Sequence, residues 1–208
     1  MTDDASRPTA RGRRTLEAID AAARTVIAEK GFLKMTVADI VKTAGRSPAS
    51  FYNYYDSKEA LLEHWAREFQ TEARRRSRET EHLVLETTKQ RVEAAVRAHW
   101  ETYRERMAEM VGVFQLAMIN DEFSKTWESL CEEPIAGITR SIERAQDRGL
   151  CPGISPRLTA TAIVSMLNQF CYENLENGRA ADADDEACIA TLTEAWYRAI
   201  YWRPDAVE

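Results

Sequence analysis

Residues 36–58 read Thr-Val-Ala-Asp-Ile-Val-Lys-Thr-Ala-Gly-Arg-Ser-Pro-Ala-Ser-Phe-Tyr-Asn-Tyr-Tyr-Asp-Ser-Lys. Thr36 is a favourable N-cap, and Asp39, three residues later, can complete a weaker form of the capping box. The apolar residues that follow have the spacing of one helix face. Gly45 can adopt the left-handed conformation that ends a helix, and Ser47 followed by Pro48 supplies the cap and first residue of another. The stretch therefore predicts two short helices joined by a tight turn.

The second of these helices is rich in aromatic residues. Phe51 and Tyr55 are four positions apart and can face the interior together, which leaves polar and aromatic side chains on the outer surface. Two short helices joined by a glycine-containing turn are typical of a helix-turn-helix, whose second helix lies in the major groove of DNA. We therefore expect DNA contacts from Arg13, Arg14, Thr36, Arg46, Ser47, Ser50, Tyr52, Asn53, Tyr54 and Lys58.

These contacts divide into two kinds. Lys58 follows Ser57, the cap of a third helix, and so stands in a first turn where the helix dipole favours an anion over a cation. A phosphate there would meet both the lysine and the free backbone amides, although an ordinary surface lysine is an equally good reading. We expect Tyr52 and Lys58 to contact phosphates. The side chains expected nearest the base edges are Ser47, Ser50, Asn53 and Tyr54.

The same stretch resembles the signature of TetR-family transcriptional repressors, over roughly residues 10 to 65. It departs from the family pattern at three positions: Val41 replaces the usual alanine, Arg46 stands where a small aliphatic residue is common, and Ala49 where glycine is common. None of these disrupts the fold, but Arg46 can add a phosphate or base contact. The matching residues are Thr36, Val37, Asp39, Ile40, Ala44, Gly45, Ser47, Tyr52, Tyr55, Ser57, Lys58, Glu59, Leu61 and Leu62.

Length and composition indicate an all-α protein with two parts. A chain of 208 residues suits a small DNA-binding domain joined to a larger helical domain. Its 44% hydrophobic residues can form a sizeable core, and only eight Gly and six Pro argue against an all-β fold. We predict a three-helix helix-turn-helix domain with a basic N-terminal arm in residues 1–57, and a helical effector-binding and dimerisation domain in residues 58–208.

The charge is unevenly divided along the chain. The net charge is −6, but residues 1–58 carry 10 basic and 7 acidic side chains, whereas residues 59–208 carry 18 and 27. An acidic body and a basic tip orient the molecule towards DNA before contact. The arginines of residues 7–14 predict a flexible arm that touches phosphates or enters a minor groove, the alternative being a solvated tail. The arginines of residues 74–78 are far from Lys58 along the chain. For them, a solvated helix face is favoured over a second DNA-binding site.

Large aromatic residues recur through the second part of the chain. Each ring taken singly fits an ordinary core, but several on different helices pack with gaps, which indicates an apolar pocket. A lipophilic cation ranks slightly ahead of an acyl chain or sterol as its occupant, because rings and a buried carboxylate favour cations. The expected lining is Trp65, Phe69, Trp100, Tyr103, Phe114, Trp127, Met166 and Phe170, with polar groups from Glu173, Gln169 or Asn168.

The last two predicted helices begin with Ser155-Pro156 and with the acidic residues 182–186. They are apolar on more than one face, which predicts a four-helix interface between two copies of the chain. The resemblance implies the same homodimer. The residues expected at this interface are Ile163, Leu167, Ile189, Leu192 and Trp196.

Three classes of function remain. The first is a repressor that binds double-stranded operator DNA and is released by a hydrophobic small molecule, and the second is a regulator of the same fold controlled by a protein partner. An enzyme is the weakest class, because no Gly-rich phosphate loop or Gly-x-Ser-x-Gly is present. Isolated cysteines and histidines give no metal-ligand spacing, so we expect no metal and no cofactor. The polar N-terminus and the lack of a long apolar run predict a cytoplasmic protein without membrane contact.

Overall fold

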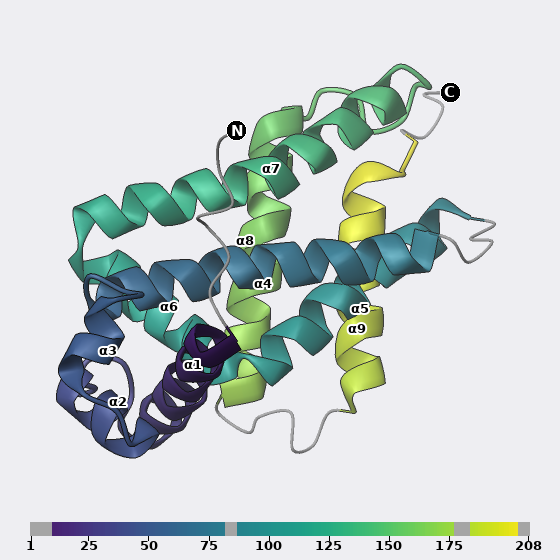
Figure 1. Cartoon of the computed structure of the whole chain (residues 1–208). Helices are drawn as coiled ribbons and strands as arrows, with labels where there is room; N and C mark the ends of the chain where they lie inside the picture. Colours follow the sequence, from purple (N-terminus) through teal and green to yellow (C-terminus); the bar gives the residue numbers. More distant parts are fainter. Residues whose placement is uncertain (1–9, 82–86, 177–183, 204–208) are drawn as a thin grey trace, which may run out of the picture. The chain divides into compact units, whose positions relative to one another are not determined.

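The computed structural model describes residues 10–81, 87–176 and 184–203. No strand occurs in these ranges, in agreement with the predicted all-α class. None of the described helices combines the length and the apolar composition that a membrane crossing requires. The helices, drawn in Figure 1, are α1 (Ala10–Lys30), α2 (Val37–Ala44), α3 (Pro48–Tyr52), α4 (Lys58–Glu81), α5 (Thr88–Glu105), α6 (Met107–Ile119), α7 (Asp121–Gln146), α8 (Pro156–Glu176) and α9 (Asp185–Ile200).

The chain divides into two compact units, and the division falls inside α4. The first unit comprises residues 1–66 and 108–124, and the second comprises residues 67–107 and 125–208. α6 therefore belongs with α1, α2 and α3. The domain boundary expected between residues 57 and 58 remains a prediction. The first compact unit also includes the first turns of α4 and most of α6.

The helix-turn-helix forms from the local signals read in the sequence. The Thr36 side chain accepts a hydrogen bond from the Asp39 amide, and the Asp39 carboxylate accepts one from the Thr36 amide, so the capping box is complete. Gly45 has φ +61° and ends α2. Ser47 caps α3, and Pro48 is the first residue of that helix. Phe51 and Tyr55 face the interior as predicted, with their ring centroids 5.6 Å apart.

In the first unit, α6 approaches α1 very closely at Gly112. A Cβ atom at this glycine would lie 3.0 Å from both Ile27 Cδ1 and Phe32 Cβ. A larger residue would push α6 away from α1 and from the loop that follows it. The close approach explains why a glycine stands in the middle of an otherwise apolar helix.

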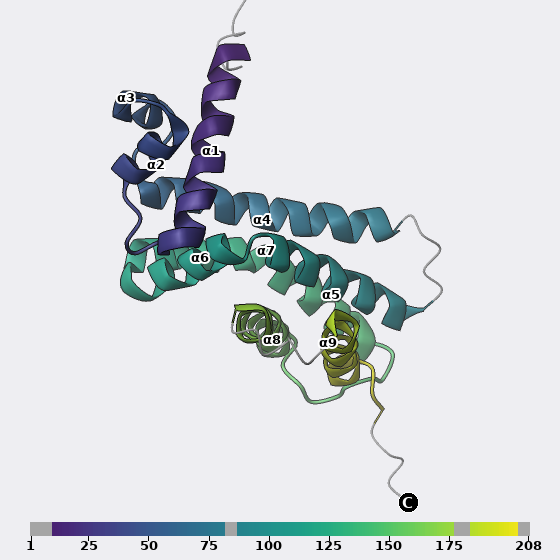
Figure 2. The same ribbon diagram turned by 90° about the horizontal axis from the view of Figure 1, so that it is seen from below.

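The second unit is organised around α5, which packs against α8 and α9. Figure 2 looks along the axes of α8 and α9. Trp100 and Tyr103 of α5 are fully buried, and the Trp100 indole donates a hydrogen bond of 3.2 Å to Asp185 at the start of α9. The four cysteines, Cys131, Cys151, Cys171 and Cys188, are free and buried.

One sequence expectation is corrected by the fold, and another remains a prediction. The basic arm is helical from Ala10 onwards, so Arg11, Arg13 and Arg14 belong to α1, while Arg7 lies outside the described residues. The dimer interface expected at α8 and α9 remains a prediction. Within the single chain, four of the expected residues are already buried and Trp196 is half-buried; the buried ones are Ile163, Leu167, Ile189 and Leu192.

Candidate nucleic-acid interface

Tyr52 and Asn53 are exposed on the outer surface at the end of α3, although the Tyr52 ring also packs edge-on against Phe51 at 5.6 Å between centroids. Tyr52 is 54% exposed, and Asn53 at the C-cap is also exposed. An asparagine amide can pair with the edge of adenine, and a tyrosine hydroxyl can bind a phosphate oxygen. Both residues therefore lie where the sequence places them, on the surface of the helix expected to enter the groove.

The hydroxyl groups of the motif are partly committed to holding the backbone. The Ser47 hydroxyl accepts a hydrogen bond of 3.3 Å from the Ser50 amide and lies 3.0 Å from the Ser50 hydroxyl. The Thr36 hydroxyl lies 2.7 Å from the Asp39 carboxylate. Hydrogen bonds from Lys30 and then Thr36 lower the pKa of Asp39 to about 2, so this carboxylate stays charged and paired at the start of α2.

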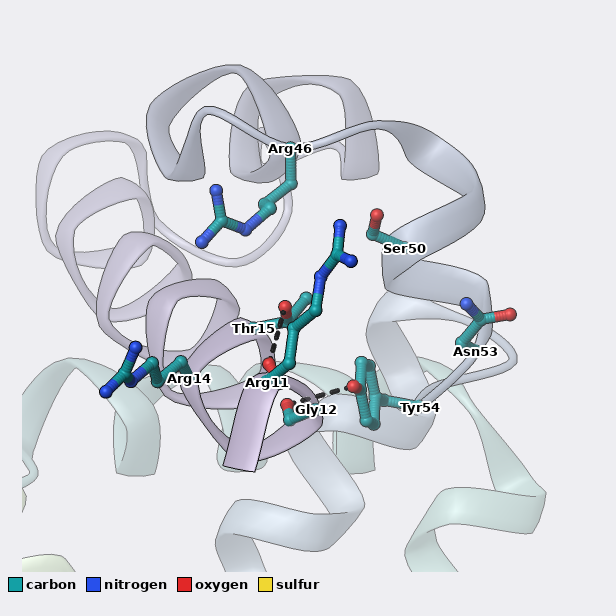
Figure 3. A pocket seen from close by; sticks show the side chains of 8 residues that line it. All are labelled: Arg11, Gly12, Arg14, Thr15, Arg46, Ser50, Asn53 and Tyr54. Atoms are coloured by element: carbon teal, nitrogen blue, oxygen red, sulfur yellow. Dashed lines mark hydrogen bonds between the residues drawn. The ribbon is translucent and has the colours of Figure 1, made fainter. Parts of the chain in front are cut away.

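Tyr54 links α3 to α1. Its hydroxyl donates a hydrogen bond of 2.9 Å to the carbonyl of Gly12, as Figure 3 shows, and its ring is half-buried. The side chain that was expected near the base edges thus fixes the start of α1 beside the end of α3. A base contact by this hydroxyl remains a prediction and would compete with the bond to Gly12.

Lys58 binds the protein's own backbone. Its ammonium lies 3.1 Å from the Phe32 carbonyl, 3.5 Å from that of Leu33 and 3.0 Å from that of Met35, and 4.6 Å from the centroid of the Phe32 ring. These carbonyls belong to the loop between α1 and α2, which explains a cation in the first turn of α4. The expected phosphate contact would have to compete for the same donors.

A pocket of about 490 Å³ opens beside α3. Its walls come from the start of α1, from the turn between α2 and α3, and from α3 with its C-cap (Figure 3). Arg11, Arg14 and Arg46 line it, and all three side chains belong to exposed residues. The complete lining is Arg11, Gly12, Arg14, Thr15, Arg46, Ser50, Asn53 and Tyr54.

This pocket contains Arg11 and Thr15, which were not selected individually as DNA contacts. Arg11 was expected to touch DNA only as one arginine of a flexible arm, in which spacing carries no information. Once α1 begins at Ala10, Arg11 lies three positions before Arg14 and four before Thr15, which places them on one helix face. Arg13 lies on α1 as well, but it does not line the pocket.

The other arginine cluster has a structural explanation. Arg75 and Arg76 both bind Glu72 one turn earlier on α4, and Arg76 also binds Glu105 of α5. Hydrogen bonds from Arg75 and Arg76 lower the pKa of Glu72 to about 2. Arg74 pairs with Glu133. This pairing fits the favoured reading of a solvated face.

The residues expected to line an apolar pocket fall into both units. Trp65 and Phe114 belong to the first unit, whereas Phe69, Trp100, Tyr103, Trp127, Met166, Phe170 and Glu173 belong to the second. In the second unit the Trp100 and Phe170 rings lie 6.2 Å apart, and those of Phe69 and Tyr103 lie 6.0 Å apart. Glu173 is exposed and accepts a hydrogen bond from Gln169, so it is not the buried carboxylate that was expected to favour a cation.

His99 joins the second of these ring pairs and was not selected from the sequence. Its ring centroid lies 5.6 Å from that of Phe69 and 6.0 Å from that of Tyr103. Part of the residue is accessible, but its Nε2 atom is shielded from solvent and has no hydrogen-bond partner among the described residues. Desolvation lowers the pKa of His99 to about 4, so the imidazole is neutral near pH 7. Within the same described residues, no group of His, Cys, Asp or Glu gathers where it could hold a metal ion.

Comparison with known proteins assigns the two ends of the chain to two family models. Residues 19–64 match the family described as bacterial regulatory proteins, tetR family, and residues 92–202 match the C-terminal domain of the transcriptional regulator EthR. The HTH-type transcriptional regulator EthR of Mycolicibacterium smegmatis is 25% identical, over 97% of this chain and 96% of that protein. The uncharacterized HTH-type regulator YvdT of Bacillus subtilis is 50% identical over 46 residues, which are 22% of this chain and 24% of that protein.

Solved structures share the fold. The regulator FadR from Bacillus subtilis, in complex with stearoyl-CoA, has a TM-score of 0.69 at 19% identity, over 89% of this chain and 100% of that one. FadR from Bacillus halodurans has a TM-score of 0.71 at 16% identity, over 92% and 96%. These relatives are transcriptional regulators and not enzymes. The protein therefore belongs to the TetR family of DNA-binding transcriptional regulators, with a C-terminal domain of the EthR type.

Proposed function

We propose that the protein is a homodimeric repressor that binds operator DNA and releases it when a hydrophobic small molecule occupies the second unit. The observation that carries the DNA-binding part is the arginine-lined pocket beside α3, next to the exposed Tyr52 and Asn53. A dimer would present two such surfaces to half-sites about 34 Å apart or a multiple of that spacing. A dimer bound to both half-sites would block other proteins from the same DNA.

The proposed effector site lies among the aromatic residues of the second unit. Trp100 faces Phe170, and Phe69 faces Tyr103 and His99, so large rings gather from α4, α5 and α8. Two buried polar atoms of this unit, His99 Nε2 and Asn168 Oδ1, have no hydrogen-bond partner among the described residues. Buried polar groups usually have partners, so a ligand that supplies one would be held in a defined orientation.

The charges of the second unit favour a neutral or acyl-type effector over a cation. Asp185 already accepts a hydrogen bond from Trp100 and pairs with Arg104, and Glu186 pairs with Arg97 at 2.5 Å. Glu173 is exposed to solvent, so it supplies no buried carboxylate to a cation among these rings. The binding of stearoyl-CoA by FadR from Bacillus subtilis supports an acyl chain as the first class to test.

Control of DNA binding requires that the effector distinguish two states of the protein. α4 is one helix from Lys58 to Glu81, and the division between the units falls inside it. A ligand-dependent tilt of α4 would therefore move the first unit and change the separation of the two DNA-reading heads in the dimer. The effector can lower the affinity for DNA only by the factor by which it binds the DNA-free state more tightly than the DNA-binding state.

The test uses a duplex that the full-length protein selects from a random DNA pool. Operator-bound protein is titrated with acyl, neutral polycyclic and cationic hydrophobic compounds, and release is followed by fluorescence anisotropy. Phe170→Ala should raise the concentration of a releasing compound needed for half-release by about tenfold or more. The reason is that the variant removes the apolar contact of one aromatic ring with the compound. Trp202→Ala, which removes an exposed ring outside this cluster, is the control.

The outcomes separate the two classes of regulator. Release by acyl compounds that is weakened only by Phe170→Ala supports the proposal. If neither variant changes the release of DNA, the effector site does not include Phe170 and lies elsewhere in the protein. If no compound releases DNA, control by a protein partner, the alternative left open by the sequence, becomes the better account.

A further inference from the structure

The pocket beside α3 combines features that a generally basic surface lacks. Three separate elements build it, and each contributes a side chain to one space of about 490 Å³. Arg11 comes from α1, Arg46 from the turn, and Ser50 from α3. Figure 3 shows the side chains of Arg11 and Arg46 extending into the same space.

The chemistry of the lining selects an anion. Its charged side chains are the three arginines, and no carboxylate lines the pocket. Among the described residues, no acidic side chain forms an ion pair with Arg11, Arg14 or Arg46, in contrast to the paired arginines of α4 and α5. A planar guanidinium presents donors in a fixed fork that matches a phosphate, and two forks can share its oxygens.

We propose that this pocket holds one backbone phosphate of the operator, gripped jointly by Arg11 and Arg46. The inference rests on the proposed function and makes it specific. Ser50 and Asn53 form both the pocket wall and part of the outer face of α3. A helix in the major groove is flanked by the two sugar-phosphate strands, so the strand on the α1 side passes over the pocket mouth.

The position of Arg11 depends on a second residue. The hydrogen bond from the Tyr54 hydroxyl to the Gly12 carbonyl joins α1 to α3 next to Arg11. Tyr54 is therefore a positioning residue: it holds one arginine opposite the other. Arg46, from the turn between α2 and α3, supplies the second guanidinium.

The experiment measures binding of the full-length protein to its selected duplex across a range of KCl concentrations. Arg11→Ala and Arg46→Ala should each weaken binding roughly tenfold, as expected for a lost charge-assisted contact. Because the salt slope counts phosphates, the double variant should reduce it by only about 0.9 per half-site, whereas two separate phosphates would reduce it by about 1.8. Arg140→Ala, an exposed arginine of α7, removes the same charge elsewhere and should change neither quantity.

Duplexes with single neutral methylphosphonate groups locate the phosphate. One position per half-site should weaken the wild-type protein and have little further effect on the Arg11→Ala, Arg46→Ala double variant. Tyr54→Phe should weaken the contact with the phosphate at that same position. The protein's preference for the selected duplex over other sequences should stay unchanged.

Two results would overturn the inference and leave DNA binding intact. If the wild-type protein binds its duplex but both arginine variants bind equally well with an unchanged salt slope, the pocket holds no phosphate. A flat methylphosphonate profile, together with saturable inhibition by inorganic phosphate at constant ionic strength that Arg46→Ala abolishes, would assign the pocket to a free anion. Failure of the wild-type protein to select any duplex would instead count against the proposed function itself.

Discussion

Arg24 of α1 forms an ion pair with Glu109 of α6, and its guanidinium carbon lies 5.0 Å from the centroid of the Trp65 ring. Glu109 is buried, with 5% of the residue exposed, whereas the Arg24 side chain is 36% exposed. All three residues belong to the first unit. Together with the close approach at Gly112, this pair holds α6 against the helix that carries the arginines of the pocket.

The first prediction concerns this ion pair. Arg24→Met should lower the free energy of unfolding by about 1–3 kcal/mol, because it removes the charge partner of a buried carboxylate while solvent reduces the full effect. Urea denaturation followed by circular dichroism measures the loss. Adding Glu109→Gln to Arg24→Met should restore part of the stability. A double variant whose loss of stability relative to the wild type equals the sum of the two single losses would contradict the pairing.

The second prediction concerns Lys58. Lys58→Met should lower the free energy of unfolding by roughly 1–2 kcal/mol relative to Lys34→Met, an exposed control, because it removes a cation hydrogen-bonded to the loop between α1 and α2. The salt slope of DNA binding should stay unchanged. Unchanged stability with a slope reduced by about 0.9 would instead support the phosphate contact that the sequence indicates.

The third prediction is a pH dependence set by His99. The pKa of this imidazole is lowered to about 4 in the folded protein, against an ordinary value of 6.5. Between these values the unfolded chain binds a proton that the folded protein does not, so stability rises with pH in this window and is lost as the pH falls from about 6.5 towards 4. His99→Gln should flatten this part of the stability curve, whereas the exposed His64→Gln should leave it as steep as in the wild type.

The fourth prediction concerns assembly. Since the apolar faces of α8 and α9 pack inside a single chain, the proposed dimer must use their exposed faces, which carry Ala162 and Ser165 on α8 and Ala190 and Ala195 on α9. Ala162→Glu and Ala195→Glu should give folded monomers in light scattering, because each places a charge in a closely packed interface. Ala21→Glu, at an exposed position of α1, should remain dimeric. Dimers that persist in both α8 and α9 variants would place the interface elsewhere.

Local signals allowed the helix-turn-helix to be predicted almost completely. The caps at Thr36 and Ser47 and the left-handed Gly45 act within a few residues, so their spacing alone determines where α2 and α3 begin and end. The start of α8 at Pro156 follows the same logic. These elements needed no knowledge of distant residues.

Features that depend on distant residues were beyond the sequence. The carbonyls that bind Lys58 lie more than 20 positions away, and the partner of Arg24 lies 85 positions away. For α8 and α9, apolar residues on several faces left undecided which face a single chain buries. The pocket beside α3 was not predicted, although several of its lining residues were expected to contact DNA. The position of Arg11 becomes informative only when α1 is known to begin at Ala10.

The most direct test of DNA reading by α3 is the affinity of the wild-type and Asn53→Ala proteins for the selected duplex and for a scrambled duplex at one fixed salt concentration. Asn53 is exposed at the end of α3 and carries no net charge, so its removal should affect base recognition and not general attraction to DNA. We predict that Asn53→Ala weakens binding to the selected duplex by about tenfold, as for a lost base contact of 1–3 kcal/mol, and leaves binding to the scrambled duplex unchanged. Equal binding of both duplexes by the wild-type protein, or equal loss on both in the variant, would contradict sequence reading by this helix.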